Sequence, residues 1–451
     1  MKKEQIRQRI KLKTQPVNPR RSALPCLVVS DGQGHVFEIP GLEMAGRQRD
    51  ILKRPANPEL IPLPHGSSLF ELPGRIPVGY DPVQKKFVPV THYQGKPVIS
   101  VAAFMAPAYS QLLLAACQVK DPSIKLPLFA YTAVGWRAGR FCVAACRVDA
   151  DIRQDLGQMD DRVIEAGAVK TLKRYPGNRL VDHLVQNCVR RYHCPAARNF
   201  VQNRWECPVP TSVSCNARCL GCISWQPKTS GVPVTQERLS FVPTPEEIVE
   251  FTVPHLNEAP RPVISFGQGC EGEPLLQGDV IEAAIYKIRQ QTSAGTINLN
   301  TNASLPGVVE RLCAAGLDSI RVSLNSARQA LYNTYYAPRN YGFEDVLESM
   351  NVMRRHGRWI SLNYFIFPGL TDDPEETAAL IDLVRRFRVD YIQMRNLNID
   401  PDWYIKKMGL GGLMSKPMGI LRWQKKVKQA APWIRFGYFN PPREDWQDQG
   451  R

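Results

Sequence analysis

Three cysteines lie close together in the segment SVSCNARCLGC, residues 212–222. They are Cys215, Cys219 and Cys222, spaced as C-x3-C-x2-C. Three thiolates in one short loop can hold three corners of a cubane iron–sulfur cluster. A structural zinc site would need a fourth Cys or His at a typical pair spacing, and the next cysteine downstream is Cys270. The pattern therefore favours a cluster with one iron left open to a small molecule over structural zinc or idle thiols.

Three further polar segments follow at regular intervals, each at the end of a short apolar run. They are CEGEPLL (270–276), NTNAS (300–304) and LDSIRVSLNS (317–326). In a parallel α/β fold, residues at the carboxyl ends of neighbouring strands meet at one edge of the sheet. We therefore expect these segments to lie beside the cysteine loop.

In type and order, the four segments resemble the motifs of the radical SAM superfamily, over roughly residues 208–400. The resemblance implies that Cys215, Cys219 and Cys222 bind a [4Fe–4S] cluster. It also implies that the fourth iron is chelated by S-adenosylmethionine (SAM). The subfamily is not identified.

The resemblance also implies a set of SAM contacts. The GEP motif lies at the loop that binds the SAM amino group, NTNAS matches a Thr-Asn-Gly loop, and the last segment carries polar contacts of the fourth strand. The implied residues are Gly272, Glu273, Pro274, Thr301, Asn302, Ser323 and Asn325. From its place near the end of the last expected strand, Arg395 is a further candidate for a carboxylate contact, with a surface ion pair as the alternative.

Four positions depart from the family pattern. Glu271 replaces the first Gly of the Gly-Gly-Glu-Pro loop, Ala303 replaces a Gly, and Asn325 stands where Asp is frequent. Gly221 replaces an aromatic residue that commonly lies near the adenine. How the adenine is held therefore stays open.

The resemblance implies an enzyme that reductively cleaves SAM to a 5′-deoxyadenosyl radical, which abstracts hydrogen from a substrate. It also implies a low-potential electron donor of flavodoxin or ferredoxin type. We favour a macromolecular substrate, RNA or a protein or peptide. A small metabolite is the alternative, and a non-catalytic iron–sulfur or zinc-binding protein is a third reading.

Strands and helices alternate along the same region. The expected strands are 209–214, 263–269, 296–302, 319–326, 359–367 and 389–397. The expected helices are 244–259, 278–292, 305–316, 343–357 and 371–387. This alternation predicts a parallel sheet with right-handed crossovers. The predicted fold is α/β, a partial (βα)6 TIM-type barrel of radical SAM type preceded by an N-terminal α+β domain.

The remaining chain divides by composition. We expect a basic N-terminal arm (1–24), an N-terminal α+β domain of unknown role (25–187), a cysteine-bearing connector (188–207), a radical SAM core (208–400) and a basic C-terminal extension with four tryptophans (401–451). Within the N-terminal domain, two strands joined by RAGR are expected over 128–148, and mainly helix over 150–187.

A second cysteine group precedes the cluster loop. It comprises Cys188, Cys194 and Cys207. An auxiliary Fe–S cluster or zinc bound by these residues is one interpretation. Buried inert cysteine is the other, because their spacing is not that of a reliable metal signature. Cys270 is expected to be a packed residue, with a catalytic thiol as the alternative.

The formal net charge is +16, and residues 1–21 alone carry eight Lys or Arg against one Glu. Such a charge favours an anionic partner. No apolar signal-peptide core is seen at the N-terminus, so we expect a reducing, cytoplasmic location. The uncharged stretch 98–119 is long enough to span a bilayer, but its Pro and polar residues favour a buried strand and helix.

Overall fold

The computed structural model describes residues 11–12, 24–412 and 415–446. Apart from β1 (Lys11–Leu12) and Leu24, the expected basic arm lies outside these residues. The chain forms two compact units. The first comprises 1–147, 366–375 and 396–424, and the second comprises 148–365, 376–395 and 425–451.

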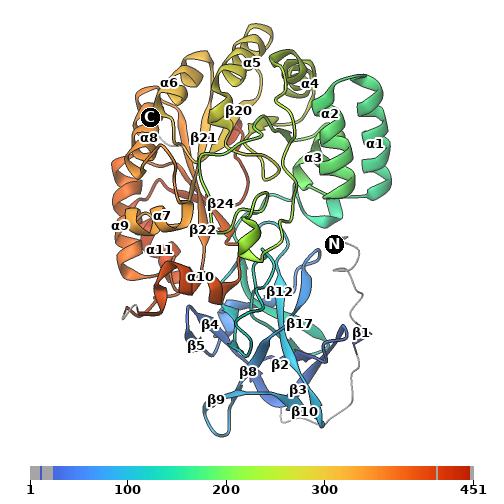
Figure 1. The fold of residues 1–451 in the computed structure, drawn as a ribbon, viewed down its shortest axis with the longest axis vertical. Coiled ribbons are helices and arrows are strands. Elements are labelled where there is room, and N and C mark those ends of the chain that lie inside the picture. Colours follow the sequence, from blue (N-terminus) through green and yellow to red (C-terminus); the bar gives the residue numbers. More distant parts are fainter. Residues whose placement is uncertain (1–10, 13–23, 413–414, 447–451) are drawn as a thin grey trace. The chain divides into compact units, whose positions relative to one another are not determined.

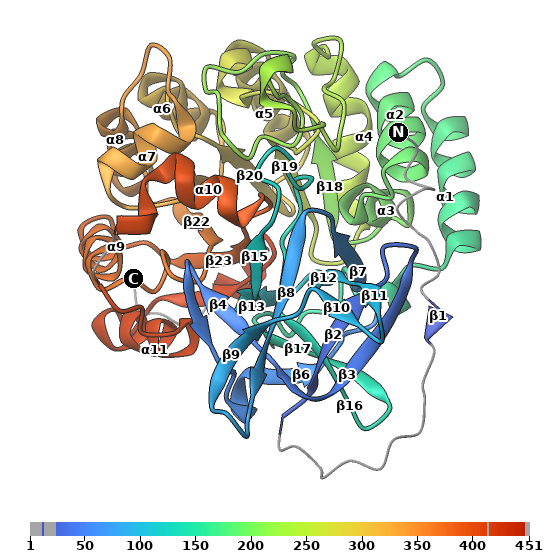
Figure 2. The ribbon, with the colours of Figure 1, turned by 60° about the horizontal axis from the view of Figure 1, so that its bottom comes forward.

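The first unit is built mainly of strands. After β1, its strands are β2 (Cys26–Ser30), β3 (His35–Met44), β4 (Gly46–Gln48), β5 (Ile51–Lys53), β6 (Leu60–Pro62), β7 (Ser68–Leu72), β8 (Arg75–Asp81), β9 (Lys86–Pro89), β10 (His92–Tyr93), β11 (Lys96–Pro97), β12 (Ile99–Phe104), β13 (Tyr109–Gln111), β14 (Leu114–Ala115), β15 (Cys117–Val119), β16 (Val134–Arg137) and β17 (Arg140–Arg147). Most of them belong to one twelve-stranded sheet whose main path is β13-β17-β16-β2-β3-β8-β15. Figure 2 shows this unit with its strands facing the viewer.

Apolar side chains of the first unit form its core between these strands. Val28, Val101, Val134 and Val143 are buried together in one cluster. The predicted hairpin over 128–148 is confirmed, because β16 and β17 pair antiparallel around the Ala138–Gly139 turn.

The stretch 98–119 contains no helix, so that part of the expectation is wrong. It forms the short strands β12 to β15. Its apolar character reflects burial, since residues Ala102, Ala103, Leu113 and Leu114 are each at most 1% exposed. Among the described residues, no helix has the length and apolar character needed to cross a membrane.

The second unit alternates helices with parallel strands. Its helices are α1 (Asp161–Arg174), α2 (Arg179–His183), the π-helix η4 (Leu184–Arg191), α3 (Pro195–Val201), α4 (Pro245–Glu258), α5 (Gly278–Gln291), α6 (Pro306–Ala315), α7 (Gln329–Tyr336), α8 (Phe343–Arg355) and α9 (Pro374–Arg386). Its strands are β18 (Glu206–Val209), β19 (Val263–Phe266), β20 (Thr296–Thr301), β21 (Ser319–Leu324), β22 (Trp359–Ile366), β23 (Tyr391–Asn396) and β24 (Arg435–Gly437). Figure 1 shows the helices α4, α5, α6 and α8 outside the strands.

The seven strands form one sheet in the order β18-β19-β20-β21-β22-β23-β24. The alternation of strands and helices predicted from the sequence is confirmed from β19 to β23. The first strand ends at Val209 rather than covering 209–214, because residues 211–214 turn away to contact the loop after β19. The seventh strand, β24, and the short helix α7 were not predicted.

Polar side chains connect distant strands on one face of this sheet. Asn440, just after β24, donates its amide Nδ2 to Glu206 Oε1 in β18 (3.3 Å) and to Ser265 Oγ in β19 (3.1 Å). Arg321 in β21 donates to Gln393 Oε1 in β23 at 3.0 Å, past the intervening β22. Contacts between strands this far apart in the sheet order require a concave face.

The helices of the range 150–187 do not group with the strands before them. The first unit ends at Arg147, and α1 and α2 lie in the second unit. The contacts between residues therefore divide the expected α+β domain (25–187) after Arg147. Downstream, α10 (Pro401–Met408) belongs to the first unit, α11 (Ile420–Ala430) begins in the first and continues into the second, and β24 completes the sheet.

Candidate cluster and cofactor site

The cysteine loop begins by pairing with the segment that follows β19. The Gly272 N–H donates to the Ser212 carbonyl and the Glu273 N–H to the Ser214 carbonyl, both at 2.8 Å. A Cβ at Gly272 would lie 1.8 Å from the Ser214 oxygen, so this approach requires glycine. The expected meeting of the cysteine loop with the GEP segment is thus present, immediately before Cys215.

The side chain of Glu271 holds together the same two segments, the start of the cysteine loop and the loop after β19. Its carboxylate accepts backbone hydrogen bonds from Thr211 (2.7 Å), Ser212 (2.9 Å) and Gln268 (2.6 Å). The side chain is buried, and burial raises its pKa to about 7. The residue that departs from the family pattern therefore joins the end of β18 to the end of β19. Sequence reasoning recorded this departure but did not predict its role.

Glu273 connects the GEP segment to the end of β20. One carboxylate oxygen accepts from the Leu275 N–H (3.1 Å) and from the Thr301 hydroxyl, and the other accepts from the Asn302 N–H at 2.9 Å. Burial raises the pKa of Glu273 to about 7. Pro274 opens the 3-10 turn η6 (Pro274–Gln277) that follows. The candidate residues of two segments thus lie together.

Asn216, inside the cysteine loop, binds the NTNAS segment directly. Its Oδ1 accepts from Asn302 Nδ2 and its Nδ2 donates to Ser304 Oγ, both at 2.8 Å. Between them, Ala303 has a φ of 57°, which explains why many family members carry Gly at this position. Sequence reasoning missed Asn216, because a lone Asn in a loop gives no signal of its partner.

The far side of the loop rests on α7. The Arg218 N–H donates to the Tyr336 carbonyl (2.8 Å) and the Leu220 N–H to the Tyr335 carbonyl (2.9 Å). Tyr332 stacks on Tyr336, with ring centroids 4.4 Å apart. The loop is therefore supported by segments from three different strand ends, which is the positioning that a cofactor site needs.

Cys215, Cys219 and Cys222 are each half-buried residues. The sulfur atoms of Cys215 and Cys219 are largely shielded from water. Burial raises the pKa of Cys215 to about 11 and that of Cys219 well above its ordinary value. Arg238 opposes this effect, because its Nη2 lies 3.6 Å from Cys222 Sγ while its Nε donates to Ser224 Oγ at 3.1 Å. A cation beside thiols favours the thiolate form that binds metal. Arg238 was not predicted from the sequence.

The arrangement of these thiols fits a cluster better than a single ion. Among the described residues, the one group whose ligand atoms all lie within 4.8 Å of one another is His183, Cys188 and Cys270. The thiols of Cys215, Cys219 and Cys222 do not all lie within this distance of one another. A cubane binds each thiolate at a different iron, so its ligands are spread more widely than those of one ion. The residues present therefore fit the expected [4Fe–4S] group.

The remaining candidates lie on β21 and β23. Ser323 is half-buried, and Asn325 is buried with its Nδ2 donating to the Leu331 carbonyl of α7 at 3.4 Å. The Arg395 guanidinium lies 4.1 Å above the Tyr438 ring, and no ion pair of Arg395 is present in the part of the chain described. None of these contacts identifies a SAM atom, so their assigned roles stay predictions.

The second cysteine group, for which an auxiliary metal site was one interpretation, is not brought together by the fold. Cys188 lies beside Cys270, with 3.8 Å between the two Sγ atoms. Cys207 is buried in β18, and Cys194 caps the start of α3. Among the described residues, Cys188, Cys194 and Cys207 do not form a group of close ligand atoms.

Comparison with known proteins agrees with this geometry. The model of the radical SAM superfamily matches residues 209–381. Bovine "Molybdenum cofactor biosynthesis protein 1" is 27% identical over 43% of this chain and 29% of its own length. The "Probable dual-specificity RNA methyltransferase RlmN" of a Synechococcus strain is 30% identical over 26% of this chain and 36% of its own. The "GTP 3',8-cyclase" of Streptomyces coelicolor is 24% identical over 44% and 55%.

The chain thus spans between 29% and 55% of the length of these three relatives. Among solved structures, methylornithine synthase (PylB) aligns with a TM-score of 0.36 and 12% identity, over 63% of this chain and 74% of that one. Residues 209–381, which match the family model, contain the three loop cysteines, the GEP and NTNAS segments and the end of β21. Residues 209–381, within the α/β unit, therefore form a domain of the radical SAM superfamily.

Proposed function

We propose that the chain binds a [4Fe–4S] cluster through Cys215, Cys219 and Cys222 and SAM at its open iron. When bound, these groups supply one-electron cleavage of SAM and hydrogen abstraction from a substrate. The observation that supports this most is the seating of the cysteine loop: its backbone pairs with Gly272 and Glu273. We also propose a flavodoxin- or ferredoxin-type electron donor and a cytoplasmic location.

The protein's own residues hold the cofactor in this proposal. Glu273 is buried, and a carboxylate whose pKa is raised by burial is stabilised in its charged form by a nearby cation such as the SAM ammonium. Three of its four acceptor directions already bind protein donors, so one remains for a ligand. Thr301 and Asn302 position Glu273 and the loop. Ser323, Asn325 and Arg395 are proposed to contact SAM through polar side chains that carry no negative charge.

We further propose that the concave sheet of the second unit is a partial barrel of radical SAM type. The contacts of Asn440 with β18 and β19 support this assignment, because they bring the last part of the chain back to the first strand. We keep the radical SAM core at 208–400, with 188–207 as connector and 401–451 as extension. The role of the N-terminal β-rich part is not assigned.

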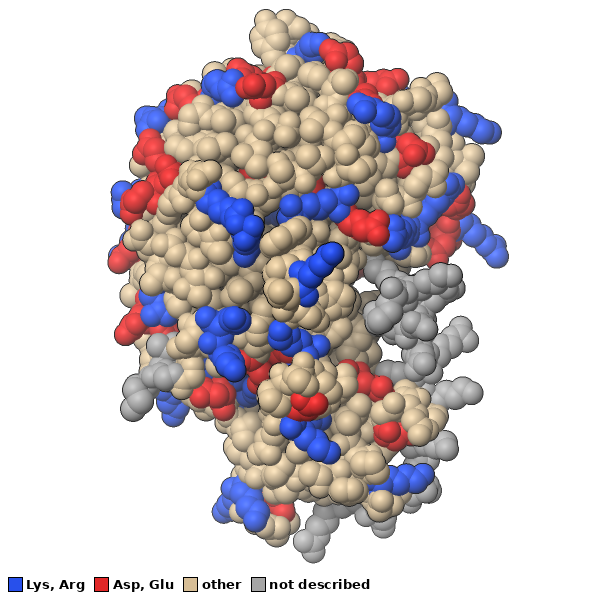
Figure 3. All heavy atoms as spheres, in the orientation of Figure 1, with Lys and Arg blue, Asp and Glu red and all other residues tan. Residues whose placement is uncertain are grey.

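For the substrate we propose a macromolecule, RNA or a protein. The net charge of +16 supports this. Much of that charge lies in residues 1–21, however, and on the face shown in Figure 3 basic and acidic side chains are intermingled over the second unit. Ion pairs such as Arg174–Glu258 and Arg191–Glu237 offset basic charge there. The proposal therefore depends mainly on the arm.

A second candidate, a small anionic metabolite, is favoured by two arginines on the concave face. The Nε atoms of Arg321 and Arg395 are both buried without a hydrogen-bond partner among the described residues. Burial, and next the charge of Arg395, lowers the pKa of Arg321 to about 9. Two neighbouring guanidinium groups that form no ion pair within the described part of the chain are suited to a phosphate or carboxylate group.

One experiment separates these possibilities. The full chain is reconstituted anaerobically, and 5′-deoxyadenosine is measured with bulk tRNA, rRNA, a peptide pool or no addition. A rise of about tenfold with one macromolecule would support the first candidate. No response to any of them, together with an unchanged cluster EPR signal on adding SAM, would refute radical SAM chemistry in favour of a non-catalytic Fe–S protein.

The Arg321→Met variant tests the second candidate. If a small anion binds there, inorganic phosphate or citrate should inhibit 5′-deoxyadenosine formation in the wild type and about tenfold less in the variant. Equal inhibition in both proteins would exclude an anion site at Arg321.

A further inference from the structure

A second group of ligand atoms lies beside the SAM loop, outside the cluster site. His183 ends α2, Cys188 lies in the π-helix η4, and Cys270 follows β19 directly before Glu271. Their ligand atoms all lie within 4.8 Å of one another, and all three residues are buried. Segments far apart in the chain therefore bring two thiols and an imidazole together in the second unit.

The separation of the two sulfurs is informative. Cys188 Sγ and Cys270 Sγ are 3.8 Å apart. Two thiolates on one tetrahedral zinc ion, each about 2.3 Å from the metal, are about 3.8 Å apart. A disulfide would need about 2.05 Å. An S–H···S contact is also compatible with 3.8 Å, so the distance is necessary for a metal site without being sufficient.

The local helix geometry also favours binding of one metal ion by His183 and Cys188. In a π-helix the hydrogen bonds run from i to i+5, and η4 covers Leu184–Arg191 immediately after His183. This winding brings residues five positions apart, such as His183 and Cys188, onto one side of the helix. π-helical turns cost stability and often occur at functional sites, so the irregularity itself needs an explanation.

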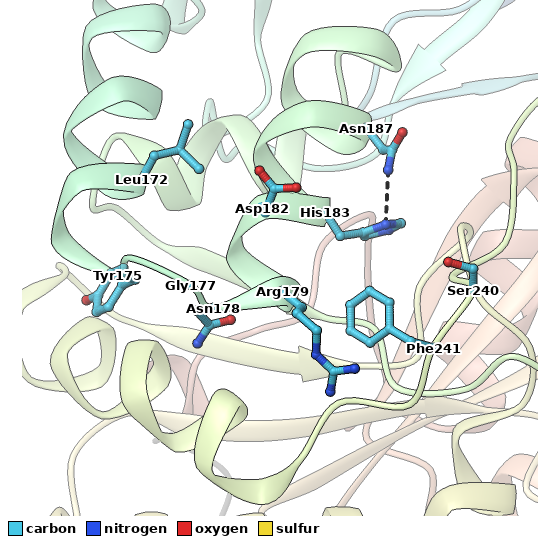
Figure 4. A pocket seen from close by; sticks show the side chains of 10 residues that line it. All are labelled: Leu172, Tyr175, Gly177, Asn178, Arg179, Asp182, His183, Asn187, Ser240 and Phe241. Atoms are coloured by element: carbon cyan, nitrogen blue, oxygen red, sulfur yellow. Dashed lines mark hydrogen bonds between the residues drawn. The ribbon is translucent and has the colours of Figure 1, made fainter.

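The imidazole has an unused nitrogen. His183 Nε2 is buried and has no hydrogen-bond partner among the described residues. The other nitrogen, Nδ1, lies 3.1 Å from the Asn187 amide, and Figure 4 shows these two side chains pointing toward each other. With the Asn187 carboxamide turned so that its oxygen faces the ring, Nδ1–H donates to it and Nε2 is left as the metal-binding nitrogen, which is the tautomer of metal-binding histidines. A buried, unpaired imidazole nitrogen beside two thiols is therefore suited to a metal.

A route to the group exists on the protein surface. His183 and Asn187 line a pocket of about 610 Å³, together with Arg179 and Phe241. Figure 4 shows the His183 ring at this pocket, close to Phe241. The ring centroids of His183 and Phe241 are 6.4 Å apart, in an edge-on arrangement. An ion could thus reach the imidazole without unfolding the domain.

We propose that His183, Cys188 and Cys270 bind one zinc ion. The mixed N and S donor set is typical of zinc in proteins. Cys194 is outside this group of close ligand atoms among the described residues, so we assign the fourth position to water. Since Cys270 precedes Glu271, the ion would fix the helical segment 183–188 to the loop that carries Glu271 and Glu273. The site is a positioning device for that loop and does not depend on the proposed SAM chemistry.

The test is metal analysis of the full-length protein. Wild type, purified anaerobically and incubated with Zn²⁺ alone before desalting, should contain about one zinc per chain beside its iron. His183→Gln, Cys188→Ser and Cys270→Ser should each lower bound zinc about tenfold. His255→Gln and Cys207→Ser are the matched controls, since both replace buried residues of the same type outside the group, and both should retain zinc.

A second measurement covers variants that fail to fold. X-ray absorption at the zinc edge of the wild type should show at least two sulfurs at about 2.3 Å and at least one nitrogen at about 2.0 Å. Wild type without zinc, zinc unaffected by the three substitutions, iron in place of zinc, or a Cys188–Cys270 disulfide would each overturn the proposal. Loss of SAM cleavage with zinc intact would count against the proposed function alone.

Discussion

The two cysteine groups of the second unit differ in spacing, burial and neighbouring charge. Cys215, Cys219 and Cys222 are half-buried, do not all lie within 4.8 Å of one another, and are accompanied by Arg238, which lies 3.6 Å from Cys222 Sγ. Cys188 and Cys270 are buried with their sulfurs 3.8 Å apart. A wide set with a nearby cation suits a cluster of several irons, whereas a tight set with an imidazole suits one ion. Cysteines of one domain can thus be assigned to different chemistry by geometry.

The largest expected effect separates these two groups directly. Cys222→Ala removes one of the three proposed cluster ligands, so the proposed SAM cleavage should fall by more than about 100-fold, beyond the usual effect of losing a supporting contact. Bound zinc should stay unchanged. Product analysis and metal counting on the same preparation measure both. Activity retained in Cys222→Ala would show that the loop does not hold the cluster.

The second-largest expected effect concerns the close backbone contact between Gly272 and Ser214, at the start of the cysteine loop. Gly272→Ala places a Cβ 1.8 Å from the Ser214 carbonyl oxygen, which forces the backbone apart. The free energy of unfolding should drop by about 3 kcal/mol, and iron content should fall with it. In Gly307→Ala, the control in α6, the new Cβ meets no atom within 4 Å. That variant should be as stable as wild type or up to about 1 kcal/mol more stable. If both variants have the same unfolding free energy and iron content, the backbone at Gly272 is not closely packed against Ser214.

Much of the second unit could be predicted from the sequence, because each element has its own pattern. Buried strands such as Ile297–Leu299 and amphipathic helices alternate with turn residues, which fixes a parallel sheet. β24 was missed because it has only three residues and follows a long helix. The α7 helix was missed because it has only eight residues, although its buried Tyr332, Tyr335 and Tyr336 follow the i, i+3, i+4 spacing of a helix face.

The site itself could be predicted only where a motif already carries chemistry. The loop cysteines and Glu273 stand in such motifs, and their segments do meet. Asn216, Arg238 and Glu271 could not be assigned, because their partners are backbone or side-chain groups far away in the sequence. The same reason hid His183 from the second cysteine group. Long-range geometry decides which Cys and His residues meet, and spacing alone does not show it.

A pH measurement tests His255, a buried histidine outside both cysteine groups. The His255 ring lies with Nε2 3.1 Å from the Trp205 carbonyl, and burial lowers its pKa to about 4. The unfolded chain binds a proton below about pH 6.5 and the folded chain only below about pH 4. His255 therefore stabilises the fold fully above pH 6.5, and this contribution is lost as the pH falls.

Between about pH 7 and pH 5 the wild type should lose about 2 kcal/mol of unfolding free energy relative to His255→Gln. Denaturant melts of both proteins at each pH measure the difference, and contributions common to both, including those of bound metal, cancel. A constant difference across this range would mean that His255 is accessible to protons in the folded state.

The smallest effect concerns Asn216, which ties the cluster loop to the end of β20. Asn216→Ala removes two 2.8 Å hydrogen bonds and leaves the Asn302 amide and the Ser304 hydroxyl without that partner. The cost should be about 1–2 kcal/mol of unfolding free energy, because both groups are largely buried. Gln291→Ala, an exposed position at the end of α5, should change stability by less than about 0.5 kcal/mol. If Asn216→Ala lowers iron content while zinc is unchanged, the loop depends on β20 and not on the second cysteine group; equal loss of both metals would mean that the two groups form one cooperative site.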